Sequence, residues 1–473
     1  MDEIIGRKKE IELLNNYLQS NKAEFLVVTG RRRIGKTFLI KQFFKNKFTF
    51  YISGAENATK TRQLFNFTVA LREYGNTPYP PVNSWQEAFV QLKHFLSNIE
   101  TNERIVVFID ELPWLDNTKS GFLSAFEYWW NTYASSDSRI FLIVCGSATS
   151  WIMNKIIKNR GGLHNRVTRQ IRLQPFTLQE TESFLQSRNI ILDRYQIAEC
   201  YMIMGGIPYY LEQMQKGSSV YQNIDNLFFH KTGILREEFD KVYNSLFKHS
   251  EKYIRIIEAL SNKNKGLSRE EIVETTNITD GGTFTKMLEE LELCDFIRSY
   301  HSFGKKSRSK IYQLTDFYSL FYLNFVKNKQ ITDEHFWTNI INSPIHRAWT
   351  GYAFEQLCLM HHAQIRQKLG ISGVLTYSSS WRSNEPDFGA EIDLVIDRRD
   401  HVINLCEIKY SDDEFVIDKE INENLRKKRA AFARQTNTKK TIHTTMITTY
   451  GVKQNMYWGN IQSEVKMDDL FEF

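Results

Sequence analysis

The sequence has few cysteines, no long hydrophobic run and no strong excess of either charge. Its five cysteines are odd in number, widely separated and form no C-x-x-C pair, which argues against a disulfide framework or a zinc site. The longest apolar stretches, such as residues 140–145, are about six residues long, far short of a membrane-spanning helix. No apolar signal segment follows Met1. We therefore expect a cytoplasmic protein in a reducing compartment, without membrane contact.

The rest of the composition is that of an ordinary globular chain. With 473 residues, about three or four domains are expected. Hydrophobic residues at 42% and charged residues at 25% exclude a disordered or fibrous protein. The net charge of +6 permits a nucleic-acid partner without requiring one, so the clustering of charge matters more than its sum.

Residues 24–41 carry the strongest motif. An apolar run at 25–28 leads into a loop with the sequence Gly30-Arg31-Arg32-Arg33-Ile34-Gly35-Lys36-Thr37, and a helical pattern follows. This is the G-x-x-x-x-G-K-[ST] loop between a strand and a helix, and we expect all eight residues to bind nucleotide. Its glycines let backbone N–H groups face the phosphates, Lys36 brings charge to the β- and γ-phosphates, and Thr37 offers a hydroxyl to Mg²⁺. The stretch predicts a site for ATP and Mg²⁺ rather than a glycine-rich turn beside a surface lysine.

A later strand pattern ends in two carboxylates. After Arg104, residues 105–109 form a continuous apolar run, and Asp110 and Glu111 follow it. Such a run predicts a strand buried on both faces of a parallel sheet, and ligands bind at the carboxyl ends of these strands. We expect Asp110 to hold Mg²⁺ opposite Thr37, and Glu111 to polarise the water that attacks the γ-phosphate.

Two further candidates for the nucleotide site lie after the next buried strand, residues 139–145. Ser147 or Thr149 can sense the γ-phosphate or cap the following helix, and we favour Ser147 as the sensor. Arg166 precedes a short strand at 167–173, where it is placed to act as an arginine finger in cis or toward a second copy of the chain. The alternative for Arg166 is a surface arginine in a loop rich in them.

The segments IIGRKKEI, GRRRIGKT, VVFIDE, LIVCGSATS and the later GGIPY together resemble the archaeal-type ATPases, an AAA+-like, STAND-related branch of the P-loop NTPases. The resemblance covers about residues 1–245. It implies a parallel α/β core over 1–175 and a helical lid over 176–247, in which GGIP turns the chain back toward the nucleotide. Without the resemblance, GGIP is a helix stop. Arg7 lies either near the nucleotide base or in a solvated basic turn.

Two helices joined by a turn and followed by a basic hairpin are expected within residues 248–318. The second helix is predicted over 283–293, and the strands over 296–300 and 310–314. The segment between the strands contains Lys305, Lys306 and Arg308. This order predicts a winged helix whose 283–286 turn enters a major groove while the hairpin tip meets phosphate. Such domains also connect proteins, and the glutamates of the second helix favour that alternative.

The last third of the chain places two carboxylates and a lysine on neighbouring strands. Asp393 alternates with apolar residues, and Glu407 and Lys409 are two residues apart in the next strand, so each set projects from one face. An antiparallel hairpin would bring the three side chains together. Two carboxylates can hold Mg²⁺, and a lysine can activate water or stabilise charge on a phosphate. The alternative is a surface hairpin with salt-bridged carboxylates.

The order of elements around these residues resembles the PD-(D/E)XK nuclease superfamily. It comprises a helix with Glu355, a strand at 374–377, the two strands above, a helix at 416–434 and a strand at 441–449. This part, residues 319–473, is similar to the domain of unknown function that often follows archaeal-type ATPases.

The resemblance implies that Asp393 and Glu407 are metal ligands, Lys409 is the catalytic lysine and Glu355 is an accessory acid. Asp393 sits in an E-I-D setting, so the nearby Asp387 and Glu391 remain alternatives. Downstream, Arg426 to Arg429, Arg434, Lys439 and Lys440 form either a surface for a nucleic-acid backbone or a solvated helix face.

Together these observations predict an α/β protein: a P-loop ATPase core (1–175), a helical lid (176–247), a winged helix (248–318) and a restriction-endonuclease-like domain (319–473). We expect an ATPase that couples nucleotide state to binding of nucleic acid, DNA in particular, and to Mg²⁺-dependent cleavage, with Mn²⁺ as a further candidate at the C-terminal site. Homo-oligomer formation is compatible with this prediction. The alternative is an ATP-dependent regulatory or signalling switch that binds DNA or protein and does not cleave.

Overall fold

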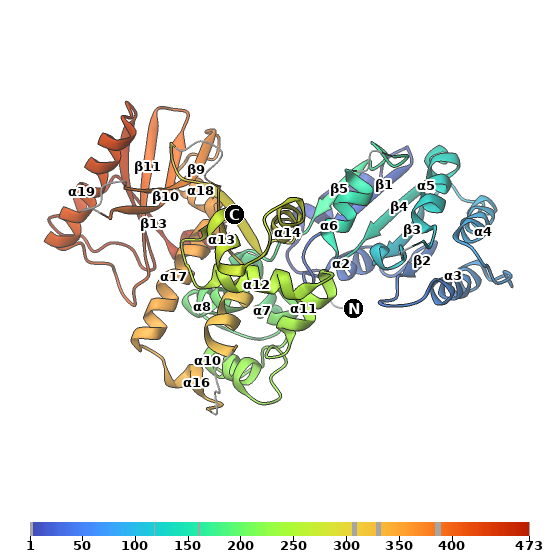
Figure 1. Cartoon of the computed structure of the whole chain (residues 1–473), viewed down its shortest axis with the longest axis horizontal. Helices are drawn as coiled ribbons and strands as arrows, with labels where there is room; N and C mark the ends of the chain where they lie inside the picture. The colour runs from blue at the N-terminus through green and yellow to red at the C-terminus, as the bar shows by residue number, and fades with distance from the viewer. Residues whose placement is uncertain are drawn as a thin grey trace. The chain divides into compact units, whose positions relative to one another are not determined.

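The computed structural model of the chain describes residues 3–117, 119–158, 161–304, 310–327, 333–383 and 389–472. The chain divides into two compact units, Met1–Pro175 and Phe176–Phe473 (Figure 1). Among the described residues, no helix combines the length and the apolar character that crossing a membrane requires.

A five-stranded sheet forms the centre of the N-terminal unit. Its strands are β1 (Glu24–Thr29), β2 (Phe50–Ser53), β3 (Ile105–Asp110), β4 (Ile140–Cys145) and β5 (Arg169–Arg172). All pairings are parallel, in the order β2-β3-β4-β1-β5. Every residue of β1, β3 and β4 is buried, which explains why these strands are continuous apolar runs rather than alternating ones. The predicted parallel α/β core is confirmed.

Helices connect these strands and cover the sheet. They are α1 (Lys8–Leu18), α2 (Lys36–Phe43), α3 (Lys60–Gly75), α4 (Trp85–Ser97), α5 (Phe122–Thr132) and α6 (Thr149–Ile152). Aromatic side chains of α3, α4 and α5 pack on one face of the sheet, with Trp85 against Phe122 and Phe25 against Trp130. This aromatic layer fixes the strands whose carboxyl ends carry the polar candidates.

The C-terminal unit begins with helices α7 (Leu178–Ser187), α8 (Arg194–Met204), α9 (Pro208–Leu211), α10 (Val220–Ile224) and α11 (Glu238–Leu246). The G-G-I-P segment is the helix stop that its composition predicts. Gly205 ends α8 with φ 69°, Gly206 follows with φ 64°, and Pro208 begins α9. The Gly206 backbone is closely surrounded, because a Cβ there would lie 2.4 Å from the carbonyl oxygen of Phe176.

A three-stranded module follows, formed by residues 250–314. It contains α12 (Ser250–Ser261), β6 (Leu267–Ser268), α13 (Arg269–Thr276), α14 (Gly282–Leu293), β7 (Ile297–His301) and β8 (Lys310–Leu314). Its antiparallel strands are ordered β6-β8-β7. A capping box begins α13, since the Ser268 hydroxyl and the Glu271 carboxylate each bind the other's backbone N–H. Lys305, Lys306 and Arg308 lie outside the described residues.

The mixed-sheet module, residues 344–472, contains the second candidate site. Its helices are α17 (Pro344–Met360), α18 (His362–Lys368) and α19 (Lys419–Thr436), preceded by α15 (Phe317–Phe321) and α16 (Phe336–Asn339). Its strands are β9 (Thr376–Arg382), β10 (Glu391–Arg398), β11 (Val402–Lys409), β12 (Thr441–Thr448) and β13 (Ser463–Lys466). The order is β13-β12-β11-β10-β9, with β9, β10 and β11 antiparallel and β11, β12 and β13 parallel.

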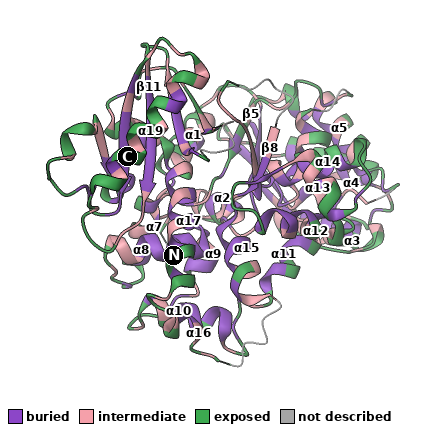
Figure 2. Cartoon of the chain, turned by 60° about the vertical axis from the view of Figure 1, so that its left-hand side comes forward, coloured by how far each residue is buried: buried purple, intermediate pink, exposed green. Residues whose placement is uncertain are grey.

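The central strand β11 is buried along most of its length (Figure 2). The predicted hairpin, helix and following strand are all observed. The preceding strand was predicted at 374–377, but β9 runs over Thr376–Arg382. That part of the prediction is wrong at both ends, because the strand carries exposed polar residues that give no alternating apolar pattern.

Candidate functional site

The phosphate loop, residues 30–37, has a backbone that requires glycine. Gly30 follows β1 with φ 139°, and a Cβ there would lie 2.5 Å from the Leu173 carbonyl oxygen and from Ile34 Cδ1. Gly35 precedes α2 with φ 85°. The loop therefore curls directly into the N-terminus of α2, where free backbone N–H groups favour an anion.

Lys36 is fixed by the loop that it belongs to. Its Nζ donates to the carbonyl oxygens of Gly30 and Arg31 at 2.9 Å each, and the side chain is buried. These two hydrogen bonds hold the ammonium inside the loop. The other predicted binding residues take different positions: Arg31 and Ile34 are buried, whereas Arg32, Arg33, Gly35 and Thr37 are half-buried.

Arg7 supports the same loop from outside it. Its guanidinium is 5% exposed and donates to the carbonyl oxygens of Ile34, at 3.3 Å, and Gln174, at 2.7 Å. The alternative of a solvated basic turn is therefore wrong. Arg7 braces the backbone of the phosphate loop, and contact with a nucleotide base stays a prediction.

The carboxyl ends of β3 and β4 bring Glu111 and Ser147 together. Because β4 lies between β1 and β3, the segment after β4 can reach both neighbours. Glu111 Oε2 accepts hydrogen bonds from Ser147 N at 3.0 Å and Ser147 Oγ at 3.1 Å. On the other side, Thr149 Oγ1 donates to the Gly30 carbonyl oxygen at 3.3 Å. Both hydroxyls that the sequence offers as candidates thus contact the predicted nucleotide site. Ser147 contacts Glu111, and Thr149 contacts the phosphate loop.

Asp110 is buried beside Glu111 at the end of β3. Its Oδ1 accepts from the Glu111 backbone N–H at 2.8 Å and from the Cys145 thiol. Burial, together with the adjacent Asp110 carboxylate, raises the pKa of the Cys145 thiol well above its ordinary value, so the thiol stays protonated as a donor. Glu111 has φ 44°, a left-handed backbone conformation that few non-glycine residues adopt.

Arg166 stands apart from this group. It lies in the turn that precedes β5, its backbone N–H donates to the Leu163 carbonyl oxygen at 3.1 Å, and the residue is exposed. An exposed guanidinium suits either alternative drawn from the sequence, so the finger stays a prediction.

The hairpin of the mixed-sheet module places Asp393 beside Glu407. In the antiparallel register of β10 and β11, Leu394 pairs with Cys406 and Val395 with Leu405. The same register extended by one residue sets Asp393 opposite Glu407 on one face, at a cross-strand Cβ distance of about 5 Å. The predicted juxtaposition of the two carboxylates is therefore built into the strand pairing.

Glu407 is held by two lysines. Lys409 Nζ lies 2.9 Å from Glu407 Oε1, and Lys428 Nζ donates to both carboxylate oxygens at 3.0 and 2.7 Å. Burial alone would raise the pKa of Glu407, but the two ammonium groups hold it below its ordinary value. The same pairing outweighs burial at Lys409 and raises its pKa. Glu407 is thus an anion and Lys409 a cation at neutral pH.

The pKa values of Glu355 and Asp393 are raised, in contrast to that of Glu407. Burial, and then the neighbouring Asp393 carboxylate, raise the pKa of Glu355 on α17 to about 7. Burial and the Glu407 carboxylate likewise raise the pKa of Asp393. The site thus combines one carboxyl group of lowered pKa, Glu407, with two of raised pKa, Glu355 and Asp393. Such a site can bind a proton or a cation near neutral pH.

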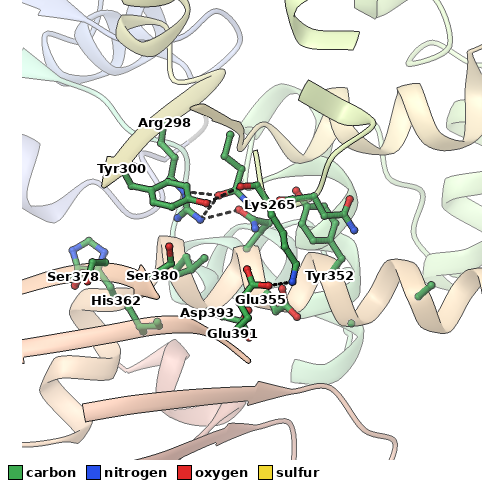
Figure 3. Close-up of a pocket in the computed structure, with 18 of the residues that line it drawn as sticks. Lys265, Arg298, Tyr300, Tyr352, Glu355, His362, Ser378, Ser380, Glu391 and Asp393 are labelled. Carbon is green, nitrogen blue, oxygen red and sulfur yellow. Dashed lines mark hydrogen bonds and ion pairs between the residues drawn. The ribbon is translucent and has the colours of Figure 1, made fainter. Parts of the chain in front are cut away.

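A cavity of about 600 Å³ opens onto this face (Figure 3). Glu355, Asp393 and Glu391 line it, and Figure 3 shows Lys265 of the three-stranded module reaching toward them from the other wall. Glu391, one of the alternative acids, pairs with Lys265. The other alternative, Asp387, lies outside the described residues.

The acids of this site provide hard oxygen donors that suit Mg²⁺ or Mn²⁺. Among the described residues, however, no group of three or more histidine, cysteine or acidic side chains is arranged to hold one ion. Lysines instead pair with two of the carboxylates, Glu407 and Glu391. The predicted set of three ligands, Asp393, Glu407 and Glu355, is therefore not observed. Asp393 and Glu407 form a pair that fits Mg²⁺, because this ion takes one or two carboxylates and completes its shell with water and phosphate.

The basic residues of α19 divide between two faces. Lys428 turns inward to Glu407, whereas Arg426 and Arg429, together with Lys440 just before β12, line a groove of about 500 Å³. Lys440 also binds Asp397 at 2.5 Å. The groove retains the exposed arginines that a phosphate backbone would require.

Residues 4–214 match the model of a family described as an ATPase domain predominantly from Archaea. This part of the chain is an archaeal-type P-loop ATPase domain. An uncharacterized protein of Methanocaldococcus jannaschii is 23% identical over 409 residues, which cover 86% of this chain and 88% of that protein. An uncharacterized ATP-binding protein of the same organism is 49% identical over 43 residues, 9% of this chain and 73% of that protein.

Solved structures overlap the chain more loosely. The Walker-type ATPase of Pyrococcus abyssi is 16% identical, covers 68% of this chain and 96% of its own, and superposes with a TM-score of 0.48. The ORC2 protein of Aeropyrum pernix is 13% identical, covers 68% of this chain and 93% of its own, and has a TM-score of 0.43.

Several residues near the two sites were not predicted. In the ATPase domain, Cys145 contacts Asp110 because the carboxyl ends of β4 and β3 are adjacent. No local sequence pattern predicts this contact. Lys428 had a signal, since it falls on the helical stripe of Leu425 and Phe432 that α19 turns inward. Glu199 of α8 is buried and accepts hydrogen bonds from the Tyr221 hydroxyl at 2.8 and 2.9 Å, a pairing that needs the tertiary fold.

Proposed function

We propose that the chain uses ATP to control binding and Mg²⁺-dependent cleavage of nucleic acid, with DNA as the first candidate substrate. The ATPase domain supports the first half of this proposal. The observation that carries the second half is the shared face of Asp393, Glu407 and Lys409 on the β10–β11 hairpin. A carboxylate pair can hold a divalent cation, and the adjacent lysine can stabilise charge on a phosphate during hydrolysis.

In the ATPase domain, Lys36 and the N–H groups at the start of α2 bind the phosphates of ATP, and Thr37 and Asp110 are the oxygen donors for Mg²⁺. Glu111 orients the attacking water. Ser147, which donates two hydrogen bonds to Glu111 Oε2, positions that carboxylate and senses the γ-phosphate. Mg²⁺, when bound, neutralises charge that develops on the phosphate oxygens.

Arg166 then completes the ATPase site, in cis or in a second copy of the chain. Its exposure on the turn before β5 suits donation to a neighbour. If Arg166 acts in a second copy, ATP turnover per chain rises with protein concentration in the parent, and Arg166→Ala removes that rise.

At the C-terminal site, Asp393 and Glu407 are the ligands for a divalent cation, which would supply a water of lowered pKa for attack on phosphorus. Lys409 stabilises the charge of the phosphate oxygens. Glu355, with its pKa near 7, accepts or returns a proton at neutral pH. Lys428 keeps Glu407 ionised and in position.

We infer that the three-stranded module is a winged helix. It has two helices, α13 and α14, followed by the antiparallel strands β7 and β8. Thr283, Thr285 and Lys286 are exposed at the start of α14, as a groove-reading turn requires. The groove on α19 offers a second phosphate contact through Arg426 and Arg429.

A regulatory switch that binds without cleaving is the second candidate. It is favoured by one observation: Glu289 is exposed on α14, whereas Glu290 and Glu292 are engaged within the module by the Tyr253 hydroxyl and by Ser299 and Lys310. An exposed carboxylate on this helix repels a phosphate backbone and suits contact with a protein better.

The test incubates the full chain with labelled single-stranded DNA, duplex DNA and RNA, in Mg²⁺ or Mn²⁺, with and without ATP. Lys409→Ala and Lys36→Ala are compared with Lys419→Ala and Lys47→Ala, matched exposed lysines outside both sites. We expect Lys409→Ala to abolish cleavage while ATP turnover persists, and Lys36→Ala to abolish ATP turnover. Cleavage that survives Lys409→Ala refutes the nuclease site. Retained DNA binding without cleavage by the parent establishes the switch.

A further inference from the structure

The cavity beside the C-terminal carboxylates has two walls of different origin. Helix α17 and strands β9 and β10 form one wall and carry the acids. The three-stranded module forms the other wall and contributes Lys265, Arg298 and Tyr300 (Figure 3). A cation from a separate module therefore faces the predicted metal site.

Lys265 is held in a built turn between α12 and β6. The Tyr300 hydroxyl donates to the Lys265 carbonyl oxygen at 2.7 Å, and Gln313 Nε2 donates to the Asn264 carbonyl oxygen at 2.5 Å. Gly266 has φ 77°, and a Cβ there would lie 2.3 Å from the Tyr312 carbonyl oxygen. These contacts hold the turn in place, and Lys265 lines the cavity.

The Lys265 ammonium meets the acids of the opposite wall. It forms an ion pair with Glu391, and its charge also acts on Asp393 and Glu355. Glu407 is already paired with two other lysines. Lys265 therefore neutralises Glu391 at the edge of the cluster, assisted by Arg382, which reaches Glu391 at 3.5 Å, and it adds its charge to those of Lys428 and Lys409 at Asp393.

The module that carries Lys265 is docked on the edge of the mixed sheet. Beyond the end of β7, the backbone N–H of Phe303 donates to the Ser380 carbonyl oxygen of β9 at 2.8 Å, and Ser302 forms a parallel bridge with Ser380. The Phe303 ring packs against Phe432 at 5.0 Å. The contact covers the edge strand β9, and Arg298 of β7 also donates to Gln356 Oε1 of α17 at 3.3 Å.

We propose that Lys265 is an internal counter-ion of the carboxylate site and competes with the divalent cation for it. The inference rests on the proposed function, because it takes Asp393 as a cation ligand. A lysine ammonium and a dication repel each other at one set of carboxylates. Cation binding therefore weakens docking of the three-stranded module, and docking weakens cation binding by the same factor. The docked module keeps the site closed until cation and nucleic acid displace Lys265.

The first experiment measures Mn²⁺ affinity of the full chain without nucleotide, from the electron paramagnetic resonance signal of free Mn²⁺. We expect Lys265→Gln to lower the dissociation constant about tenfold, within the usual range of coupling between sites. Lys265→Arg keeps the charge and the parental value. Lys263→Gln, which removes only the exposed pair with Glu271, also keeps it. Asp393→Asn is expected to abolish Mn²⁺ binding at this site, which identifies the site that the measurement reports.

The second experiment measures docking with Ser302→Cys and Ser380→Cys combined in one chain. All five native cysteines are buried, so the engineered pair reports the β7–β9 contact. Mn²⁺ is expected to slow disulfide formation severalfold, and the addition of Lys265→Gln to slow it without Mn²⁺. Equal Mn²⁺ affinity in the parent and Lys265→Gln, or a disulfide rate indifferent to Mn²⁺, overturns the proposal.

Neither measurement depends on cleavage. If Lys265→Gln lowers the Mn²⁺ dissociation constant tenfold but the chain cuts no substrate, the counter-ion role of Lys265 stands and the nuclease function is refuted. If Lys409→Ala loses cleavage but Lys265→Gln leaves Mn²⁺ affinity unchanged, the nuclease function stands and the counter-ion role is refuted.

Discussion

Lys428→Met tests how Glu407 is held at the C-terminal site. The substitution keeps most of the side-chain volume and removes the ammonium that donates to Glu407 at 3.0 and 2.7 Å. Lys409 remains at 2.9 Å. The change therefore leaves a buried carboxylate with one cationic partner in place of two.

The magnitude follows from this remaining pair. Loss of the only partner of a buried charge costs about 3–5 kcal/mol. Lys409 stays, and the Lys428 side chain is 19% exposed, so we expect about 1–2 kcal/mol. Loss of the Lys428 ammonium also raises the pKa of Glu407 back toward its ordinary value. Because the pKa of folded Glu407 lies below its unfolded value of 4.5, the stabilisation is present above pH 4.5 and is lost as the pH falls through the folded pKa.

Native-state hydrogen exchange of the β11 amides measures the local free energy of opening. A double-mutant cycle with Glu407→Gln isolates the pair, and Lys427→Met, an exposed neighbour on α19, is the matched control. We expect a coupling of about 1–2 kcal/mol at pH 7 that shrinks below pH 4.5. A coupling under about 0.3 kcal/mol would show that Lys428 does not hold Glu407 in solution.

Three further predictions concern other residues. Gly30→Ala abolishes binding of a fluorescent ATP analogue, because its Cβ would lie 2.5 Å from the Leu173 carbonyl oxygen; unchanged affinity contradicts this. Ser147→Ala lowers ATP turnover at least tenfold with little change in ATP affinity, since it removes the hydroxyl hydrogen bond to Glu111 and leaves only the backbone N–H bond; an equal loss in affinity would make Ser147 a binding residue. Burial raises the pKa of Glu199 from 4.5 to about 7, so its contribution to stability is complete below pH 4.5 and is lost as the pH rises through 7. Glu199→Gln is therefore more stable than the parent at pH 8 by about 1–3 kcal/mol and equal to it at pH 4, as urea unfolding can check.

The parallel core and the phosphate loop were predictable because their signals are local. A buried parallel strand needs apolar residues on both faces, and the phosphate loop needs glycines at a fixed spacing. The sequence alone therefore predicts β1 and residues 30–37. The β10–β11 hairpin was predictable for the same reason, since Asp393, Glu407 and Lys409 alternate with apolar neighbours.

The remaining contacts depend on tertiary packing. Lys265 and Glu391 are 126 residues apart, and no periodicity relates them. Arg7 looked equally well suited to solvent, because a single arginine in a basic turn does not reveal that backbone carbonyls surround it. For Lys428, a charged run suggested an outer face, while the helical period placed one member of the run inside.

Single-turnover cleavage by Asp393→Asn tests the central claim most directly. The amide keeps the size of the carboxylate and removes its charge, and Asp400→Asn, in the turn between β10 and β11, is the control. With the substrate that the parent cuts, the account predicts a rate at least a hundredfold lower for Asp393→Asn in Mg²⁺, parental cleavage by Asp400→Asn, and parental ATP turnover in both. Cleavage by Asp393→Asn at the parental rate would contradict it.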